Sequence, residues 1–287
     1  MPLSAPVDGF RLAYDRTGNG PPAVLLHGWP GWRADYRDVV PLLAPEADVV
    51  VPDLRGFGES DRHERPPQEA YSAAAQAASV LALIEELGLD RPVLVGYDVG
   101  SRIARLIAAE HPDAIRALVL APPLPGVGER ILSADAQREF WYQPLHNLAL
   151  ADELLDGRPD AVRSYLRHFW EHWSAPGWSL PPDRFDELVA LYARPGAFTS
   201  SIAWYRSGSS GVATALSERA PAPDDRVGVP TTVLWGEHEP LYPPAWSDRL
   251  GEFYADFELQ ILAGVGHYTP LEAPQSVAEA TVRGLRR

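Results

Sequence analysis

The sequence predicts an α/β fold with a mostly parallel sheet, into which a block of helices is inserted as a cap. Short apolar segments alternate with helical segments through residue 121 and again from residue 223, which is typical of a parallel sheet covered on both faces. Residues 122–222 give helical segments separated by proline and glycine, with no convincing strand. We therefore expect residues 1–121 and 223–287 to form the core, and residues 122–222 to form a cap over the carboxyl edge of the sheet.

The elements of the core follow from periodicity and from turn residues. An antiparallel edge strand is expected at residues 10–15, where apolar and polar side chains alternate. Buried strands are expected at residues 23–26, 48–54, 92–95, 115–120, 231–235 and 258–262. Helices are expected at residues 32–43, 71–87, 101–111, 244–250 and 274–285, the second of them ending at the C-cap glycine Gly88.

Composition excludes several classes of function. The 287 residues include 39 acidic and 25 basic side chains, so the net charge of −14 disfavours binding to nucleic acid. No stretch approaches the roughly 20 apolar residues of a membrane span, and the N-terminus lacks the features of a signal peptide. With no cysteine, disulfides, thiolate metal sites and a cysteine nucleophile are excluded. We expect a cytoplasmic monomer or homodimer that acts on a small molecule, without cofactor or metal and without binding a membrane.

The segment from Gly96 to Gly100 carries the first candidate catalytic residue. An apolar strand precedes it and a helix follows, which is the context of a nucleophile elbow. The nucleophile position holds Asp98, whose carboxylate can attack an electrophilic carbon and form an ester. Taken alone, the pattern fits equally well an ordinary turn in which Asp98 caps the helix.

Two further polar residues follow expected strands, so both should lie beside Asp98. Glu239 comes after the strand at 231–235, and His267 comes after the strand at 258–262. In an open α/β sheet, ligands bind at the carboxyl ends of the strands, where all three side chains can meet. His267 could then activate water as a general base, with Glu239 fixing its tautomer.

Over essentially its full length, the chain resembles the α/β-hydrolase superfamily, in particular the branch with an aspartate nucleophile. HGWPG at residues 27–31 is similar to the oxyanion-hole motif of that branch, and DLRGFGES at 53–60 to a second loop motif. GHYTPLEAP at 266–274 resembles the usual surroundings of the catalytic histidine. The resemblance implies a cis peptide bond at Trp29–Pro30, and an oxyanion hole formed by the amides of Trp29 and Val99. One departure is Glu239, which stands where the family more often has aspartate.

Within that branch, the sequence of the cap favours epoxide hydrolases. FWYQ at residues 140–143 and AWYR at 203–206 resemble the segments that carry the two proton-donating tyrosines of epoxide hydrolases, here Tyr142 and Tyr205. Tyrosine, with a pKa of about 10, can protonate the alkoxide formed when an epoxide opens. The alternative for both residues is aromatic packing in a tryptophan-rich cap. The product of such an enzyme would be a vicinal diol.

Dehalogenases are the alternative within the branch. Haloalkane dehalogenases usually place a tryptophan directly after the nucleophile, where this chain has Val99. Haloacetate dehalogenases have two arginines near the nucleophile, of which this chain supplies only Arg102. A protein of this fold that binds a ligand without catalysis is a third hypothesis, and the presence of Asp98, Glu239 and His267 argues against it.

The cap also suggests the kind of substrate. Its many aromatic residues favour an aryl or polycyclic epoxide. We expect contacts to the substrate from five residues, namely Trp29, Trp141, His146, Trp204 and Tyr268. HFWEH at residues 168–172 matches a zinc-peptidase pattern but lacks an evident third ligand, so His168 and His172 are expected to line or support the pocket.

Overall fold

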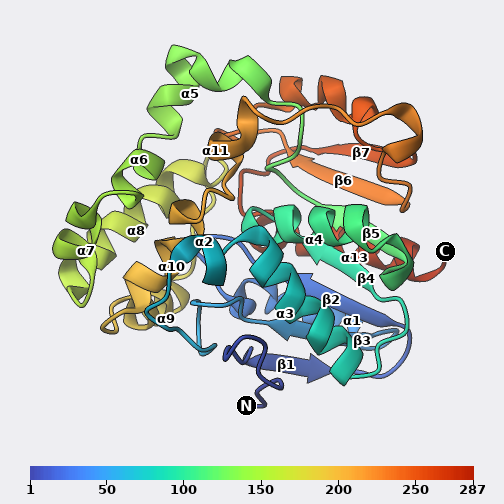
Figure 1. Cartoon of the computed structure of the whole chain (residues 1–287), viewed down its shortest axis with the longest axis horizontal. Coiled ribbons are helices and arrows are strands. Elements are labelled where there is room, and N and C mark those ends of the chain that lie inside the picture. The colour runs from blue at the N-terminus through green and yellow to red at the C-terminus, as the bar shows by residue number, and fades with distance from the viewer.

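The computed structural model describes all 287 residues, and its centre is a seven-stranded sheet (Figure 1). The strands are β1 (Tyr14–Thr17), β2 (Pro22–Leu26), β3 (Asp48–Pro52), β4 (Val93–Gly96), β5 (Ala117–Leu120), β6 (Thr231–Gly236) and β7 (Phe257–Leu262). Their order in the sheet is β1-β3-β2-β4-β5-β6-β7. Only β1 runs antiparallel to its neighbour, and every other pair is parallel. The predicted α/β class is therefore confirmed.

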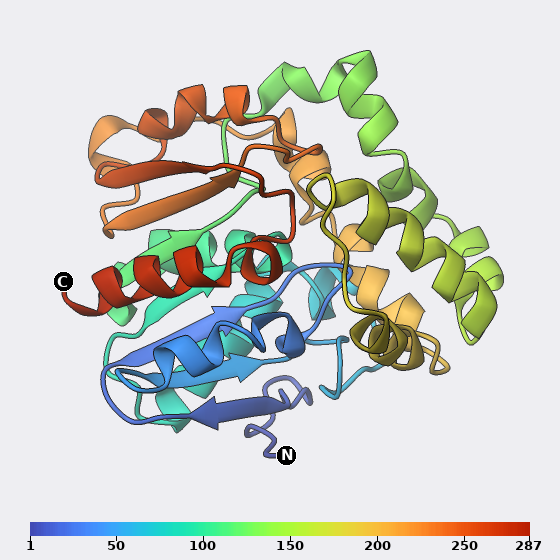
Figure 2. The ribbon, with the colours of Figure 1, turned by 180° about the vertical axis from the view of Figure 1, so that it is seen from behind.

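Helices cover both faces of the sheet, because its central strands are apolar on both sides. Every residue of β3, β4 and β5 is buried. In Figures 1 and 2, α3 (Ala73–Glu86) and α4 (Val99–Glu110) lie on one face, and α1 (Val40–Leu43) and α13 (Pro274–Leu285) lie on the other. The remaining short elements of the core are η1 (Arg33–Tyr36), α2 (Pro67–Ala70), η2 (Pro112–Ala114), η4 (Pro223–Asp225), η5 (Pro244–Glu252) and α12 (Thr269–Glu272).

Some predicted boundaries are wrong. The helix expected over residues 32–43 is two short pieces, η1 and α1. Pro41 lies in the first turn of α1, where its missing N–H is tolerated, but it could not continue a helix begun at η1. The edge strand starts at Tyr14 instead of residue 10, and the helix predicted at 244–250 is the 3₁₀ segment η5. The last helix, α13, has the predicted bounds.

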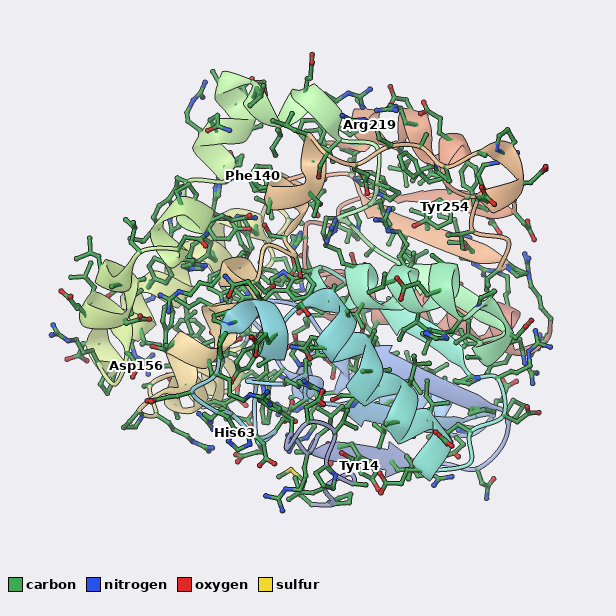
Figure 3. The ribbon with its side chains drawn as sticks, in the orientation of Figure 1. Tyr14, His63, Phe140, Asp156, Arg219 and Tyr254 are labelled. Carbon is green, nitrogen blue, oxygen red and sulfur yellow. The ribbon has the colours of Figure 1, made fainter.

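Between β5 and β6 the chain forms a block of helices that lies at the carboxyl ends of the parallel strands (Figures 1 and 2). Its elements are η3 (Gly128–Leu132), α5 (Ala134–Glu139), α6 (Tyr142–His146), α7 (Ala149–Leu155), α8 (Pro159–Trp173), α9 (Pro182–Tyr192), α10 (Ala197–Arg206) and α11 (Gly211–Ala215). We call this block the cap, and its division from the core at residues 122 and 222 stays a prediction. Side chains fill the space between cap and sheet (Figure 3). No helix in the chain combines the length and apolar character that a membrane crossing requires.

Polar contacts to α4 hold both connections between cap and core. Glu218 lies on the connection that leads from the cap back to the core, and it accepts a hydrogen bond from the Arg105 guanidinium at 2.8 Å. It also accepts one, at 2.9 Å, from the amide of Gly126, which lies on the connection from the core into the cap. Arg102 donates to the Ser209 carbonyl at 2.9 Å and to the Thr214 hydroxyl at 2.8 Å. The two connections are thus fixed to the helix that begins at Asp98.

Replacing Glu218 with alanine should loosen the cap, because it leaves Arg105 and the Gly126 amide without their acceptor. We expect the free energy of unfolding to fall by about 1–3 kcal/mol, with faster amide hydrogen exchange in residues 122–128 and 208–218. Glu46→Ala is the matched control, since its ion pair with Arg286 is 57% and 70% exposed and should contribute about 0–1 kcal/mol. Equal effects of the two substitutions would contradict the role given to Glu218.

Candidate active site

Asp98 lies in a strained turn between β4 and α4. Its φ of 49° and ψ of −120° are rare for a residue with a side chain. The turn is possible because its neighbours are glycines: a Cβ on Gly96 would lie 2.5 Å from the backbone of Gly100, and one on Gly100 would collide with the Leu26 carbonyl. The sharp turn projects the Asp98 side chain beyond the carboxyl edge of the sheet, as a nucleophile elbow requires.

The Asp98 carboxylate does not cap its helix. The structure shows no capping hydrogen bond from this side chain, which excludes the alternative left open by the sequence. Oδ1 accepts a hydrogen bond from the Trp29 amide at 2.8 Å. The approach is this close because Gly28 has no side chain, and a Cβ there would lie 2.5 Å from the Asp98 Cβ. The Val99 amide opens α4 and so has no acceptor within the helix. Of the two amides predicted for an oxyanion hole, that of Trp29 contacts the carboxylate, and the role of the Val99 amide stays a prediction.

His267 and Glu239 meet Asp98 at the same edge. The His267 Nδ1 lies 2.7 Å from a Glu239 carboxylate oxygen, and its Nε2 lies 3.6 Å from the Asp98 Oδ2. The other Glu239 oxygen accepts from the Leu241 amide at 2.9 Å, which fixes the carboxylate. This arrangement leaves Nε2, facing Asp98, as the free nitrogen of the ring.

The charges around His267 favour its protonated form. Burial alone would lower its pKa, but the carboxylates of Glu239 and Asp98 outweigh burial and raise the pKa of His267 to about 10. In the free protein His267 is therefore an imidazolium between two carboxylates.

The loop from His27 to Gly31 is fixed by a buried histidine. Its Nε2 accepts from the Leu54 amide at 3.0 Å, so its Nδ1 carries the proton and donates to the Gly28 carbonyl at 2.9 Å. Burial lowers the pKa of His27 to about 4, which keeps it neutral. The peptide bond between Trp29 and Pro30 is cis, as predicted.

Aromatic side chains of the cap enclose Trp29. Its ring stacks parallel to that of Tyr142 at 5.6 Å between centroids, and the ring of Tyr205 lies 5.7 Å away, edge-on. Tyr142 and Tyr205 are themselves perpendicular at 5.6 Å. His146 contacts Trp29 at 4.8 Å, and α8 adds contacts to Trp29 that the sequence analysis did not assign, from Tyr165, Phe169 and Trp173.

Both tyrosines stay protonated. Burial and the nearby charge of Asp98 raise the pKa values of Tyr142 and Tyr205 well above that of free tyrosine. The Gln143 amide donates to the Tyr142 oxygen at 3.1 Å, which leaves the Tyr142 proton free for another acceptor. The sequence analysis quoted Gln143 beside Tyr142 but gave it no role.

The other residues predicted to contact substrate are Trp141, Trp204 and Tyr268, and the ring of Tyr268 lies 5.5 Å from that of His267. Trp141 is 41% exposed and packs against Tyr165, His168 and Phe169, so its contact with substrate stays a prediction. Its neighbour Tyr142 points inward because adjacent helical residues face different directions. Trp204 is buried but makes none of the ring contacts around Trp29. Tyr268 is buried against Trp170, with ring centroids 3.8 Å apart.

The two histidines of the zinc-peptidase pattern and Arg102 have other partners. His172 bonds Glu139 at 2.7 Å and stacks on His168, both on the outer part of α8. Arg102 donates hydrogen bonds to Ser209 and Thr214, so its guanidinium holds the chain that connects the cap to the core.

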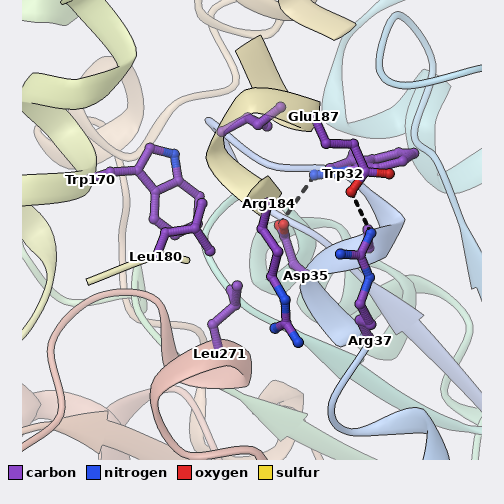
Figure 4. Close-up of a pocket in the computed structure, with 10 residues that line it drawn as sticks. Trp32, Asp35, Arg37, Trp170, Leu180, Arg184, Glu187 and Leu271 are labelled. Atoms are coloured by element: carbon purple, nitrogen blue, oxygen red, sulfur yellow. Dashed lines mark hydrogen bonds and ion pairs between the residues drawn. The ribbon is translucent and has the colours of Figure 1, made fainter. Parts of the chain in front are cut away.

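A small cavity of about 20 Å³ lies between cap and core, beside Asp35 and Trp170 (Figure 4). Asp35 accepts from the Trp32 amide at 3.2 Å and from the hydroxyl of Tyr97, the residue before Asp98. Burial raises the pKa of Asp35 to about 8. Asp98 is 7% exposed, so little of its side chain is open to solvent in this arrangement.

Comparison with known proteins gives a consistent result. The family model for the alpha/beta hydrolase fold matches residues 21–274. A soluble epoxide hydrolase of Corynebacterium sp. (strain C12) is 28% identical, over 97% of this chain and 95% of its own length. A fluoroacetate dehalogenase of Burkholderia sp. is 31% identical, over 67% of this chain and 64% of its own. A Bacillus megaterium epoxide hydrolase, solved with an inhibitor, has the same fold, with a TM-score of 0.82 at 21% identity and 99% coverage of both chains. Because the family model matches most of the chain, the chain belongs to the α/β-hydrolase fold family.

Proposed function

We propose that the protein is an epoxide hydrolase, which converts an aryl epoxide to a vicinal diol through an ester at Asp98. The observation that carries the proposal is the pair of buried, protonated tyrosines, Tyr142 and Tyr205, gathered with Trp29 over the carboxylate. Relatives named as epoxide hydrolases, similar over nearly the whole chain, support it. The aromatic walls favour an aryl group on the substrate.

Ring opening uses the free oxygen of the carboxylate. Oδ1 is held by the Trp29 amide, so Oδ2 attacks an epoxide carbon while the bond from that carbon to the ring oxygen breaks. Tyr142 and Tyr205 bind the ring oxygen, and one of them transfers its proton to the alkoxide. The hydrogen bond from Gln143 to the Tyr142 oxygen stabilises the negative charge that develops on that tyrosine.

Ester formation then converts His267 from an acid into a base. The ester carries no negative charge, so Asp98 no longer raises the pKa of His267. His267 can then give up its proton, which restores the tyrosine. The neutral Nε2 takes a proton from water, and the hydroxide attacks the ester carbonyl, whose oxygen faces the amides of Trp29 and Val99. The bond between the carbonyl carbon and the diol oxygen then breaks, and the departing alkoxide takes the proton that the hydroxide brought in. Release of the diol leaves the Asp98 carboxylate beside the His267 imidazolium, so all protons balance.

Dehalogenation of a haloacid is the second candidate function, favoured by the similarity to a fluoroacetate dehalogenase. It would use the same ester at Asp98, but it needs donors for a carboxylate and a halide. Arg102 is occupied with Ser209 and Thr214, and Val99 offers no side-chain donor. Epoxide opening needs neither group, and we prefer it for that reason.

Mass spectrometry of His267→Gln should reveal the ester. Without its base, the variant should accumulate an adduct of the full mass of an aryl epoxide, and the further change Asp98→Asn should abolish it. An adduct formed only from a haloacetate, lighter by one hydrogen halide, would establish the dehalogenase instead.

The pKa of His267 should fall when Asp98 loses its charge. In Asp98→Asn we expect a decrease of about 1–3 pH units, followed by NMR of the imidazole. Because the pKa of about 10 exceeds the value of about 6.5 for free histidine, the interaction stabilises the native protein fully below pH 6.5 and is lost as pH rises through 10. An unchanged pKa in Asp98→Asn would refute this mechanism for activating the base.

Each tyrosine should be needed for ring opening. Tyr142→Phe and Tyr205→Phe should each lower kcat/KM for an aryl epoxide by about 10²-fold or more. Tyr254→Phe is a matched control, because Tyr254 is buried with an unpartnered hydroxyl near β6 and β7, away from the cap (Figure 3). Full activity of either cap variant would assign that tyrosine to packing alone.

A further inference from the structure

Two buried polar atoms beside the tyrosines have no hydrogen-bond partner. They are the Gln143 Oε1 and the His146 Nδ1, on side chains of residues that are only 5% and 0% exposed. Both residues belong to α6, the short helix that carries Tyr142. A buried polar atom without a partner destabilises the protein, so two of them are costly unless a ligand satisfies them.

The Gln143 oxygen belongs to the amide group that contacts Tyr142, the proposed proton donor. The amide nitrogen of the same rigid group donates to the Tyr142 hydroxyl at 3.1 Å. The unpartnered oxygen is bonded to the same carbon as the nitrogen that contacts the Tyr142 hydroxyl. It can only accept a hydrogen bond.

His146 faces the same place from one turn further along α6. Its ring centroid lies 4.8 Å from those of Trp29 and Tyr205, and 5.4 Å from that of Tyr142. Its Nε2 is 2.9 Å from the Tyr165 hydroxyl, which holds the ring in place. Burial, together with the charge of Arg206, lowers the pKa of His146 well below that of free histidine, so the ring is neutral. Depending on the tautomer that Tyr165 selects, Nδ1 donates or accepts one hydrogen bond.

We propose that Gln143 and His146 select an epoxy alcohol, in which the carbon attached to the epoxide ring carries a hydroxyl group. A hydroxyl group can donate to the Gln143 oxygen, and it can pair with the His146 Nδ1 in either tautomer. The aryl group then lies among the aromatic side chains around Trp29. The inference rests on the proposed epoxide hydrolysis and narrows its substrate class.

The test compares two epoxides that differ by one oxygen atom, the epoxide of cinnamyl alcohol and trans-β-methylstyrene oxide. For the wild-type enzyme, kcat/KM should favour the epoxy alcohol by about 10- to 100-fold, because the hydrocarbon leaves both polar atoms unpaired. Conversion of both at similar rates would overturn this inference and leave the proposed function standing. Conversion of neither would refute the proposed function, and this inference with it.

A substitution at His146 tests whether this residue causes the preference for the epoxy alcohol. His146→Phe keeps a ring of similar shape but removes Nδ1, and the ratio of the two kcat/KM values should fall about tenfold or more towards unity. Tyr254→Phe, at a buried hydroxyl away from the cap, should leave the ratio unchanged. The ratio is measured within each enzyme, so a general loss of activity does not affect it. An unchanged ratio in His146→Phe would refute the role of His146.

A measurement on the wild-type protein covers the case in which His146→Phe does not fold. The triol product of the epoxy alcohol should inhibit the enzyme about tenfold more strongly than the diol product of the hydrocarbon epoxide. Equal inhibition by the two products would count against the inference.

Discussion

The contact between Asp98 and the Trp29 amide determines most of the geometry of the site. It depends on β2 and β4 being adjacent and parallel, with Leu26 paired to Gly96, so that the loops after both strands leave the sheet side by side. Two missing side chains make the approach possible, since Gly28 admits the Asp98 Cβ and Gly100 admits the backbone after β2. The same contact distinguishes the two carboxylate oxygens, because one faces the amides and the other faces His267. The positions of the proposed nucleophile and of the proposed oxyanion hole thus result from one packing constraint.

A second constraint is electrostatic. Asp98, His267 and Glu239 are all nearly inaccessible to water, so the imidazolium is needed to balance two buried carboxylates. A neutral ring would leave two like charges close together in a poorly solvated site. In the proposed reaction the removal of one of these charges by alkylation releases the proton of His267. The base is therefore produced only when there is an ester to hydrolyse.

The sequence predicted the core site well because strand ends are predictable. Asp98, Glu239 and His267 each follow an apolar run, and a parallel sheet brings such positions to one edge whatever the lengths of the connections. The cap was less predictable. In α6, of five residues and with Pro144 inside it, periodicity is too short to separate the inward Tyr142 from the outward Trp141. The role of Gln143 depends on the orientation of one amide group, which no sequence pattern specifies.

Arg102 shows how the same residue can serve a different purpose within a family. One turn after the nucleophile on α4, an arginine could hold the carboxylate of a haloacid, but here it bonds the Ser209 carbonyl and the Thr214 hydroxyl. Ser209 lies four residues after Tyr205, so this contact fixes the end of α10 relative to the helix that begins at Asp98. The same helix, α4, therefore helps to position both Asp98 and Tyr205, one of the proposed proton donors. Arg105 and Glu218 extend the same connection to the other side of the cap. The proposed ring opening needs a carboxylate on one side of the epoxide and a hydroxyl on the other, and contacts of α4 help to hold these two groups in place.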